Sequence, residues 1–93
     1  MESLDMKTVT IDCRLIPNRI EFHNTLRQTL SLPEWYGNNL DALHDCLTQM
    51  QLHLEFIGWD SLNGTMGHYA TVAKRAILDA CEENPGLTVE FLP

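Results

Sequence analysis

The chain has 93 residues, which is enough for one domain with a single core, and we expect one domain over residues 1–93. Hydrophobic residues make up 44% and charged residues 20% of the sequence, as in folded soluble proteins rather than disordered ones. The 13 acidic residues outnumber the 6 basic ones, giving a formal charge of -7. Direct nucleic-acid binding is therefore not expected, because it normally requires Lys and Arg side chains that neutralise phosphates.

The sequence also indicates a cellular compartment. No apolar run approaches the roughly 18 residues needed to span a bilayer, and the acidic start lacks the positive region of a secretory signal. Cys13, Cys46 and Cys81 cannot all pair within one chain, and none forms a Cys-x-x-Cys motif. We interpret them as free, mostly buried thiols in a reducing compartment. These features predict a cytoplasmic protein with no membrane partner.

The first third of the chain predicts a strand followed by a helix. Residues 8–12 alternate polar and β-branched side chains, as a strand does. Apolar residues at roughly helical spacing predict a helix over 20–30, with Asn18 near its start as a cap. These apolar residues are Ile20, Phe22, Leu26 and Leu30. Pro33 ends the helix, because proline disfavours helical geometry in the residue before it, and residues 35–38 follow as a short loop.

The rest of the chain continues this alternation. A second helix starts at its expected cap, Asn39, and carries the apolar line Leu40, Leu43, Leu47 and Met50. Residues 52–57 alternate as a second strand, and residues 58–67 indicate an irregular connection. A third helix follows, ends at 84–86 and leads into a third strand over 87–92. Its expected inner face consists of Val72, Ala73, Ala76, Ile77, Ala80 and Cys81.

This order of elements predicts the fold class. Strands that alternate with helices favour parallel pairing through right-handed crossovers. No internal repeat, low-complexity tract or linker divides the chain. The sequence therefore predicts an α/β fold, in which a small three-stranded parallel sheet is covered by about three helices.

The second predicted helix carries two carboxylates opposite its apolar line. Asp41, Asp45 and Thr48 stand at i, i+4 and i+7, and His44 lies beside them. The helix dipole explains Asp41, which lies near its positive end. Asp45 lacks such an explanation, since aspartate is a poor interior helix residue and a like-charge pair opposes the helix by a few tenths of a kcal/mol. For the two aspartates alone, a solvated face without a binding role is the simpler interpretation.

The preceding loop shifts the balance toward binding. Trp35 and Tyr36 stand just before the acidic helix, and an aromatic anchor beside charges is common in protein-binding hot spots. We expect at least one of the two rings, Tyr36, to pack on the core. Between Arg27 and Lys74 there is no Lys or Arg, so this stretch should project negative potential and attract a cationic surface.

Two chemical alternatives stay open at this point. Asp41 and Asp45 contain the groups of an acid and base pair in a small hydrolase, although they project from one convex face without a nearby Lys or Arg for an anionic substrate. His44 with either aspartate contains the ligand types of a metal site, but the other histidines are scattered through other elements. We predict a non-catalytic protein without a metal or cofactor, and the hydrolase and the metal site are the alternatives.

Residues 32–48 resemble the signature of the barstar family, the intracellular inhibitors of secreted bacterial ribonucleases of the barnase type. The matching stretch reads Leu-Pro-Glu-Trp-Tyr-Gly-Asn-Asn-Leu-Asp-Ala-Leu-His-Asp-Cys-Leu-Thr. Weaker similarity at "HNTLRQTL" and "LEF" flanks it, and the predicted order of elements agrees over nearly the whole chain. The resemblance implies a barstar-like fold and a bacterial inhibitor, a monomer when free, that blocks one ribonuclease with a cationic active site as the immunity partner of a toxin.

The resemblance also implies residue roles. Asp45 is the central mimic of substrate phosphate, Asp41 is a second acidic contact, and Trp35 covers the catalytic cleft. Because resemblance does not fix the partner, a binding module on the same scaffold that engages another basic protein is an alternative.

Further contacts follow by position. Gly37, Asn39 and Thr48 are supporting contacts, and Asp79 matches an acidic residue on the final helix of the family. His44 stands where the family has tryptophan. The Gly-Trp pair that follows the threonine in the family is Gln-Met here, and the connection before "LEF" is about three residues shorter. His44 is nevertheless included in the expected nuclease-binding surface.

Overall fold

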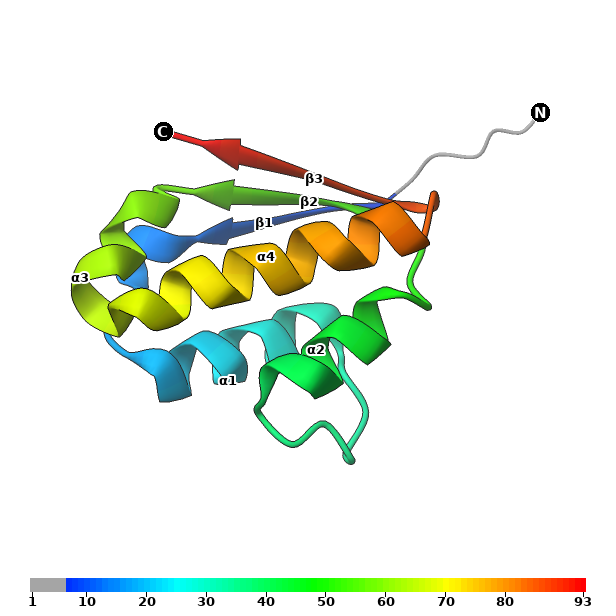
Figure 1. Cartoon of the computed structure of the whole chain (residues 1–93), viewed down its shortest axis with the longest axis horizontal. Coiled ribbons are helices and arrows are strands. Elements are labelled where there is room, and N and C mark those ends of the chain that lie inside the picture. Colours follow the sequence, from blue (N-terminus) through cyan, green and yellow to red (C-terminus); the bar gives the residue numbers. More distant parts are fainter. Residues whose placement is uncertain (1–6) are drawn as a thin grey trace.

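The computed structural model describes residues 7–93, which form a three-stranded sheet with its helices packed on one face (Figure 1). The strands are β1 (Lys7–Asp12), β2 (Leu52–Ile57) and β3 (Leu87–Leu92). The α-helices are α1 (Arg19–Leu30), α2 (Leu40–Leu47), α3 (Leu62–Met66) and α4 (His68–Glu83), and two 3-10 helices are η1 (Cys13–Leu15) and η2 (Trp59–Ser61). None of the helices within residues 7–93 is long and apolar enough to cross a membrane. The predicted fold class is confirmed.

The three strands run parallel in the order β1-β2-β3. Their register places Val9, Leu54 and Val89 side by side. Alternate residues of β2 are buried, because one face of the sheet packs against the helices and the other does not. The predicted parallel pairing and the bounds of the second and third strands are confirmed.

Both predicted helix caps are confirmed. The Asn18 side chain accepts a hydrogen bond from the Glu21 N–H at 2.9 Å, and the Asn39 side chain accepts one from the Ala42 N–H at 2.8 Å. Each bond satisfies one of the N–H groups that the first turn of a helix leaves without a partner. The starts of α1 and α2 are therefore fixed by the local sequence.

The expected irregular connection over 58–67 is wrong, because this segment contains η2 and α3. Two apolar side chains explain the helical turns. Trp59 and Leu62 are buried, and the rings of Phe56 and Phe91 lie 5.1 Å and 5.2 Å from the Trp59 ring, edge to face. Tertiary packing thus orders a segment whose glycines and polar residues indicated a loop.

Two apolar assignments to the helices are also wrong. Val72, expected on the inner face of the third helix, is 41% exposed, because the buried face of α4 lies elsewhere. Ile20 lies in α1 as predicted and is 66% exposed. The buried residues of α4 are Ala70, Ala73, Ile77 and Ala80. Met50 lies beyond the end of α2 at Leu47, although it still packs against the core.

The three cysteines are free thiols, and Cys13 and Cys46 are buried while Cys81 is half-buried. The prediction of mostly buried thiols is confirmed. Burial raises the pKa of the Cys13 thiol to about 12 and also raises the pKa values of Cys46 and Cys81. Raised pKa values disfavour the reactive thiolate, so these residues act as small core side chains.

Asn84 ties the C-terminal end of α4 to the end of α2. Its buried side-chain amide donates to the carbonyl oxygens of Leu47 at 3.0 Å and Met50 at 2.8 Å, and its side-chain oxygen accepts from the Gly86 N–H at 3.0 Å. One buried side-chain amide therefore provides hydrogen-bond partners for three backbone groups, at the end of α2 and in the turn before β3.

We expect Asn84→Ala to lower the free energy of unfolding by roughly 1–3 kcal/mol, because it leaves buried backbone groups without partners. Urea denaturation followed by circular dichroism measures this change. Asn63→Ala, at an exposed position of α3, is the matched control and should change it by less than about 0.5 kcal/mol. Equal effects of the two substitutions would contradict the role given to Asn84.

Candidate functional site

Helix α2 presents Asp41 and Asp45 to solvent. Asp41 stands in the first turn, where the positive end of the helix dipole stabilises a carboxylate. The Asp45 side chain is 70% exposed. The opposite face of α2 is buried through Leu43, Cys46 and Leu47. The helix is therefore held by its apolar side, and its carboxylates face solvent.

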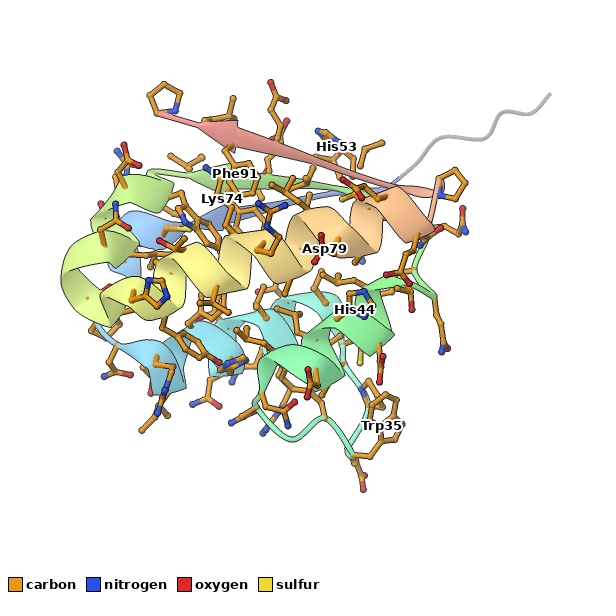
Figure 2. All side chains as sticks on the ribbon, in the orientation of Figure 1. Trp35, His44, His53, Lys74, Asp79 and Phe91 are labelled. Carbon is orange, nitrogen blue, oxygen red and sulfur yellow. The ribbon has the colours of Figure 1, made fainter. Side chains whose placement is uncertain are left out.

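The two aromatic residues of the loop before α2 differ in their exposure to solvent. Trp35 is 63% exposed, whereas Tyr36 is 2% exposed, so the expectation that Tyr36 packs on the core is confirmed. Figure 2 shows Trp35 at the edge of the molecule, near the end of α2. The Tyr36 N–H donates to the Pro33 carbonyl at 3.0 Å, which closes the turn that carries Trp35. A buried phenol thus anchors an exposed indole next to it.

A buried histidine fixes Tyr36. His23, 1% exposed, contacts the Tyr36 hydroxyl through Nδ1 and lies 2.6 Å from the Tyr69 hydroxyl through Nε2. A neutral imidazole has one donor and one acceptor nitrogen, so one hydroxyl donates to it and the other accepts. Burial, with the charges of Arg19 and Arg27, lowers the pKa of His23 to about 4. The neutral ring joins α1 and α4 to the loop.

Sequence reasoning did not identify His23 as a functional residue, although its place among the apolar residues of α1 indicated burial. It stands three residues before Leu26 and next to Phe22, so it lies on the buried face of α1. A polar residue in such a position needs partners, and the two tyrosines provide them.

Polar contacts set the remaining path of the loop. Arg27 on α1 donates to the Asn38 side chain, and Asn38 adopts a left-handed conformation with φ of 55°. The Asn39 amide donates to the Gly37 carbonyl at 3.4 Å. A Cβ on Gly37 would lie 3.0 Å from that amide nitrogen, so glycine permits the arrangement that caps α2.

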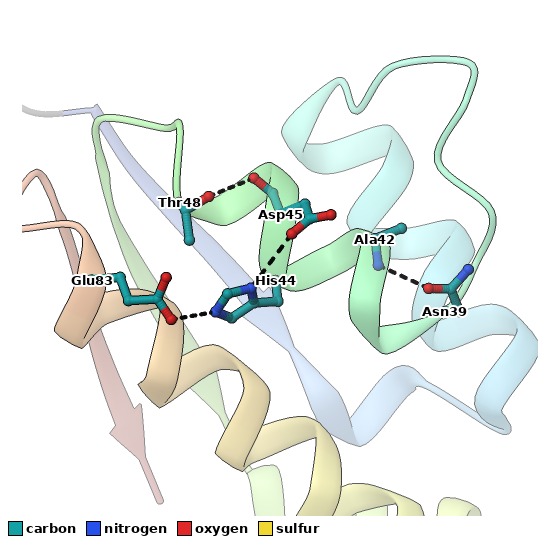
Figure 3. A network of polar contacts seen from close by, with 6 residues as sticks. All are labelled: Asn39, Ala42, His44, Asp45, Thr48 and Glu83. Carbon is teal, nitrogen blue, oxygen red and sulfur yellow. Dashed lines mark hydrogen bonds and ion pairs between the residues drawn. The ribbon is translucent and has the colours of Figure 1, made fainter.

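His44 bridges α2 and α4 (Figure 3). Its Nε2 lies 2.9 Å from Glu83 Oε2, and its Nδ1 lies 3.6 Å from Asp45 Oδ1. The hydrogen bond with Glu83, together with the charges of Glu83 and Asp45, raises the pKa of His44. The sequence places His44 beside Asp41 and Asp45, and the structure places its ring between Asp45 and Glu83. Sequence reasoning did not assign Glu83 to the site.

The remaining predicted residues, Thr48 and Asp79, lie at the end of α2 and on α4. The Thr48 hydroxyl donates to the Asp45 carbonyl at 2.7 Å, so it completes the end of α2. Asp79 is half-buried on α4, one turn before Glu83, and α2 packs against α4. The structure thus collects the predicted residues on the loop, α2 and the facing part of α4.

A shallow pocket of about 240 Å³ opens beside Trp35. Its lining consists of Ser31, Leu32, Pro33, Trp35, Cys46, Gln49 and Met50. The indole, the pocket and the carboxylates of α2 form one continuous feature, which we call the acidic surface. It consists of the exposed and half-buried residues within 33–49, together with Asp79 and Glu83 of α4. An exposed indole beside charged side chains is common in protein-binding surfaces.

Fold and surface together define a small α/β protein that presents an acidic helix and an exposed indole. Comparison with known proteins identifies the family. Residues 6–92 match the family described as Barstar (barnase inhibitor). The protein named "Putative ribonuclease inhibitor YrdF" of Bacillus subtilis (strain 168) is 37% identical over 81 residues, which cover 84% of this chain and 89% of that relative. This chain belongs to the barstar family.

The lowered pKa of His23 predicts a loss of stability in acid. Between about pH 6.5 and pH 4 the unfolded chain binds a proton at His23 that the folded chain does not bind, so acid favours unfolding. His23→Leu removes this group. The stability advantage of the wild type over His23→Leu should shrink by roughly 2–3 kcal/mol from pH 7 to pH 4 in urea denaturation. An advantage that is constant with pH would contradict a neutral, buried His23.

The His44 and Glu83 pair has the opposite pH dependence. The folded pKa of His44 is raised, so its contribution to stability is fully present below about pH 6.5 and is lost as pH rises through the folded pKa. A double-mutant cycle with His44→Gln and Glu83→Gln should give a coupling of about 0.5 kcal/mol at pH 5.5, since the pair is partly exposed. At pH 8.5 the coupling should be smaller, because a neutral imidazole keeps the hydrogen bond but loses the charge attraction. Equal coupling at both pH values would contradict the ion pair.

Proposed function

We propose that this protein is a non-catalytic inhibitor that binds a barnase-type ribonuclease in a 1:1 complex and blocks its active site with the acidic surface. One observation carries the proposal. In a member of the barstar family, two exposed carboxylates of α2 stand beside an exposed indole that a buried tyrosine anchors. The name of the Bacillus subtilis relative supports the same class of function.

The proposed mechanism is occupation of a phosphate site. A ribonuclease holds the phosphates of its substrate with cationic side chains, and Asp45 offers a carboxylate in the middle of α2 to those groups. Asp41 adds a second negative charge one turn away. Trp35 packs over the mouth of the nuclease cleft and excludes water, which strengthens the charged contacts beneath it. Substrate is then excluded because its place is filled.

Opposite charge also accelerates the encounter. The protein carries a formal charge of -7, and the loop and α2 part of the acidic surface lies in the stretch without Lys or Arg between Arg27 and Lys74. Steering by such a field brings association to about 10⁸ to 10⁹ M⁻¹s⁻¹ at low salt, and added salt slows it. Protonated His44 weakens the same field, so association is slower below the raised pKa of that residue.

Supporting residues complete the proposed interface. Gly37 and Asn39 hold the loop against the start of α2, Thr48 closes its end, and Asp79 adds a carboxylate from α4. We assign the protein the role of the immunity partner of a secreted bacterial toxin. It acts as a monomer in the cytoplasm of the cell that makes the nuclease.

We expect Asp45→Ala to weaken inhibition by about 30-fold to several thousand-fold in the dissociation constant. Removing one member of a buried charge pair costs roughly 2–5 kcal/mol in protein complexes, the barnase–barstar complex being one with even larger effects. Isothermal titration calorimetry with a barnase-type ribonuclease from the same source measures the change, and circular dichroism verifies the fold. Trp35→Ala should also weaken binding.

Asp60→Ala is the matched control, because Asp60 is an exposed aspartate on η2 outside the acidic surface. It should alter affinity by less than threefold. If Asp45→Ala and Asp60→Ala behave alike, Asp45 is not the phosphate mimic. If the wild-type protein leaves the ribonuclease active but captures another basic protein, the alternative of a binding module on this scaffold replaces the proposal.

A further inference from the structure

The face of the sheet that points away from the helices carries a cluster of three metal-ligating side chains. Strand β2 buries Leu52, Leu54 and Phe56 toward the helices, so its alternate residues, His53 and Glu55, point to the other face. Figure 2 shows His53 on that side of the sheet, far from Trp35.

The parallel register brings a third side chain to this pair. Glu90 of β3 lies directly beside Glu55, and Thr88 lies beside His53. His53 Nε2 is 3.7 Å from Glu55 Oε2 and 3.7 Å from Glu90 Oε1. One ligand atom from each of the three residues lies within 4.8 Å of the other two. One nitrogen and two oxygens therefore converge on one point above the sheet.

Two threonines orient these ligands. His53 Nδ1 lies 2.6 Å from the Thr88 hydroxyl, so when Nδ1–H donates to that oxygen the lone pair of Nε2 faces the carboxylates. The Thr10 hydroxyl of β1 donates to Glu55 Oε1 at 3.0 Å and leaves Oε2 directed toward His53. A hydrogen bond that fixes the tautomer of a histidine or the rotation of a carboxylate is typical of metal sites.

Charge on this face favours a cation. Glu55 and Glu90 are neighbours on adjacent strands, and like charges in that arrangement repel. By strand alternation, the described residues of this face include no Lys or Arg; Arg14, which follows β1, already pairs with Asp12 at 2.8 Å. The two 3.7 Å separations exceed hydrogen-bond length. Neighbouring ligand atoms in a tetrahedral zinc site are about 3.4 Å apart, which is close to these separations.

We propose that His53, Glu55 and Glu90 bind a divalent transition-metal ion, for which Zn²⁺ is the matching probe. Zn²⁺ accepts imidazole nitrogen and carboxylate oxygen ligands, and three protein ligands leave a fourth position for water. The ion joins β2 to β3 on the face opposite the acidic surface. The site is therefore independent of the proposed inhibition.

The test is a titration of the untagged full-length protein with ZnCl₂ at pH 7.5. Calorimetry should give one site per chain. At a free Zn²⁺ concentration ten times the dissociation constant, the midpoint of thermal unfolding should rise by about 5–10 °C, because the ion binds the folded chain alone. His53→Gln and Glu90→Gln should each weaken binding at least tenfold. His68→Gln, an exposed histidine at the start of α4, is the matched control and should leave binding unchanged.

Several results would overturn the proposal. If Zn²⁺ binds His53→Gln as tightly as it binds the wild type, the ion occupies another site. If Zn²⁺ does not bind the wild type below 1 mM, the three side chains form a polar cluster without a metal. Co²⁺ in place of Zn²⁺ gives a second readout, since absorption from a cobalt–thiolate bond would assign the ion to a cysteine. Ribonuclease inhibition should be the same with and without the metal, so this test and that of the inhibitor proposal succeed or fail separately.

Discussion

The handedness of two chain crossovers determines where everything else in the molecule lies. The strands pair in sequence order, and both parallel connections run through helices. Right-handed crossovers between strands added in one direction place all connecting helices on the same face of the sheet, as Figure 1 shows. One face of the sheet therefore builds the core, and the other carries mostly polar side chains. The acidic surface lies on the outer side of the helical layer, and the His53 cluster lies on the bare side of the sheet.

Within the helical layer, buried polar side chains fix the positions of the helices and the loop relative to one another. His23 joins α1, the loop and α4 through two tyrosine hydroxyls, and Asn84 joins the ends of α4 and α2 through backbone carbonyls. Both side chains are buried, so the folded protein loses stability if either one moves away from its hydrogen-bond partners. These contacts define one arrangement of α2 relative to α4, and hence the spacing of Asp45 from Glu83.

The predictable parts of this protein are those encoded by neighbouring residues. Asn18 and Asn39 cap their helices through bonds to groups three residues away, and strand alternation identified 52–57 and 87–92. The contact between His44 and Glu83 spans 39 residues of sequence, and the site on β2 and β3 depends on the register of two strands. Periodicity cannot reveal such pairs, because tertiary packing creates them. The same reason explains the exposed Val72 and the helical turns around Trp59.

The burial of Tyr36 has a consequence for the entropy of association. The phenol is enclosed at 2% exposure and Arg27 contacts Asn38, so the backbone that carries the exposed indole is tied to the core before any partner binds. The conformational entropy of this segment is lost during folding rather than at the moment of contact. A partner therefore meets a preorganised surface, and little of the binding free energy is consumed in arranging it.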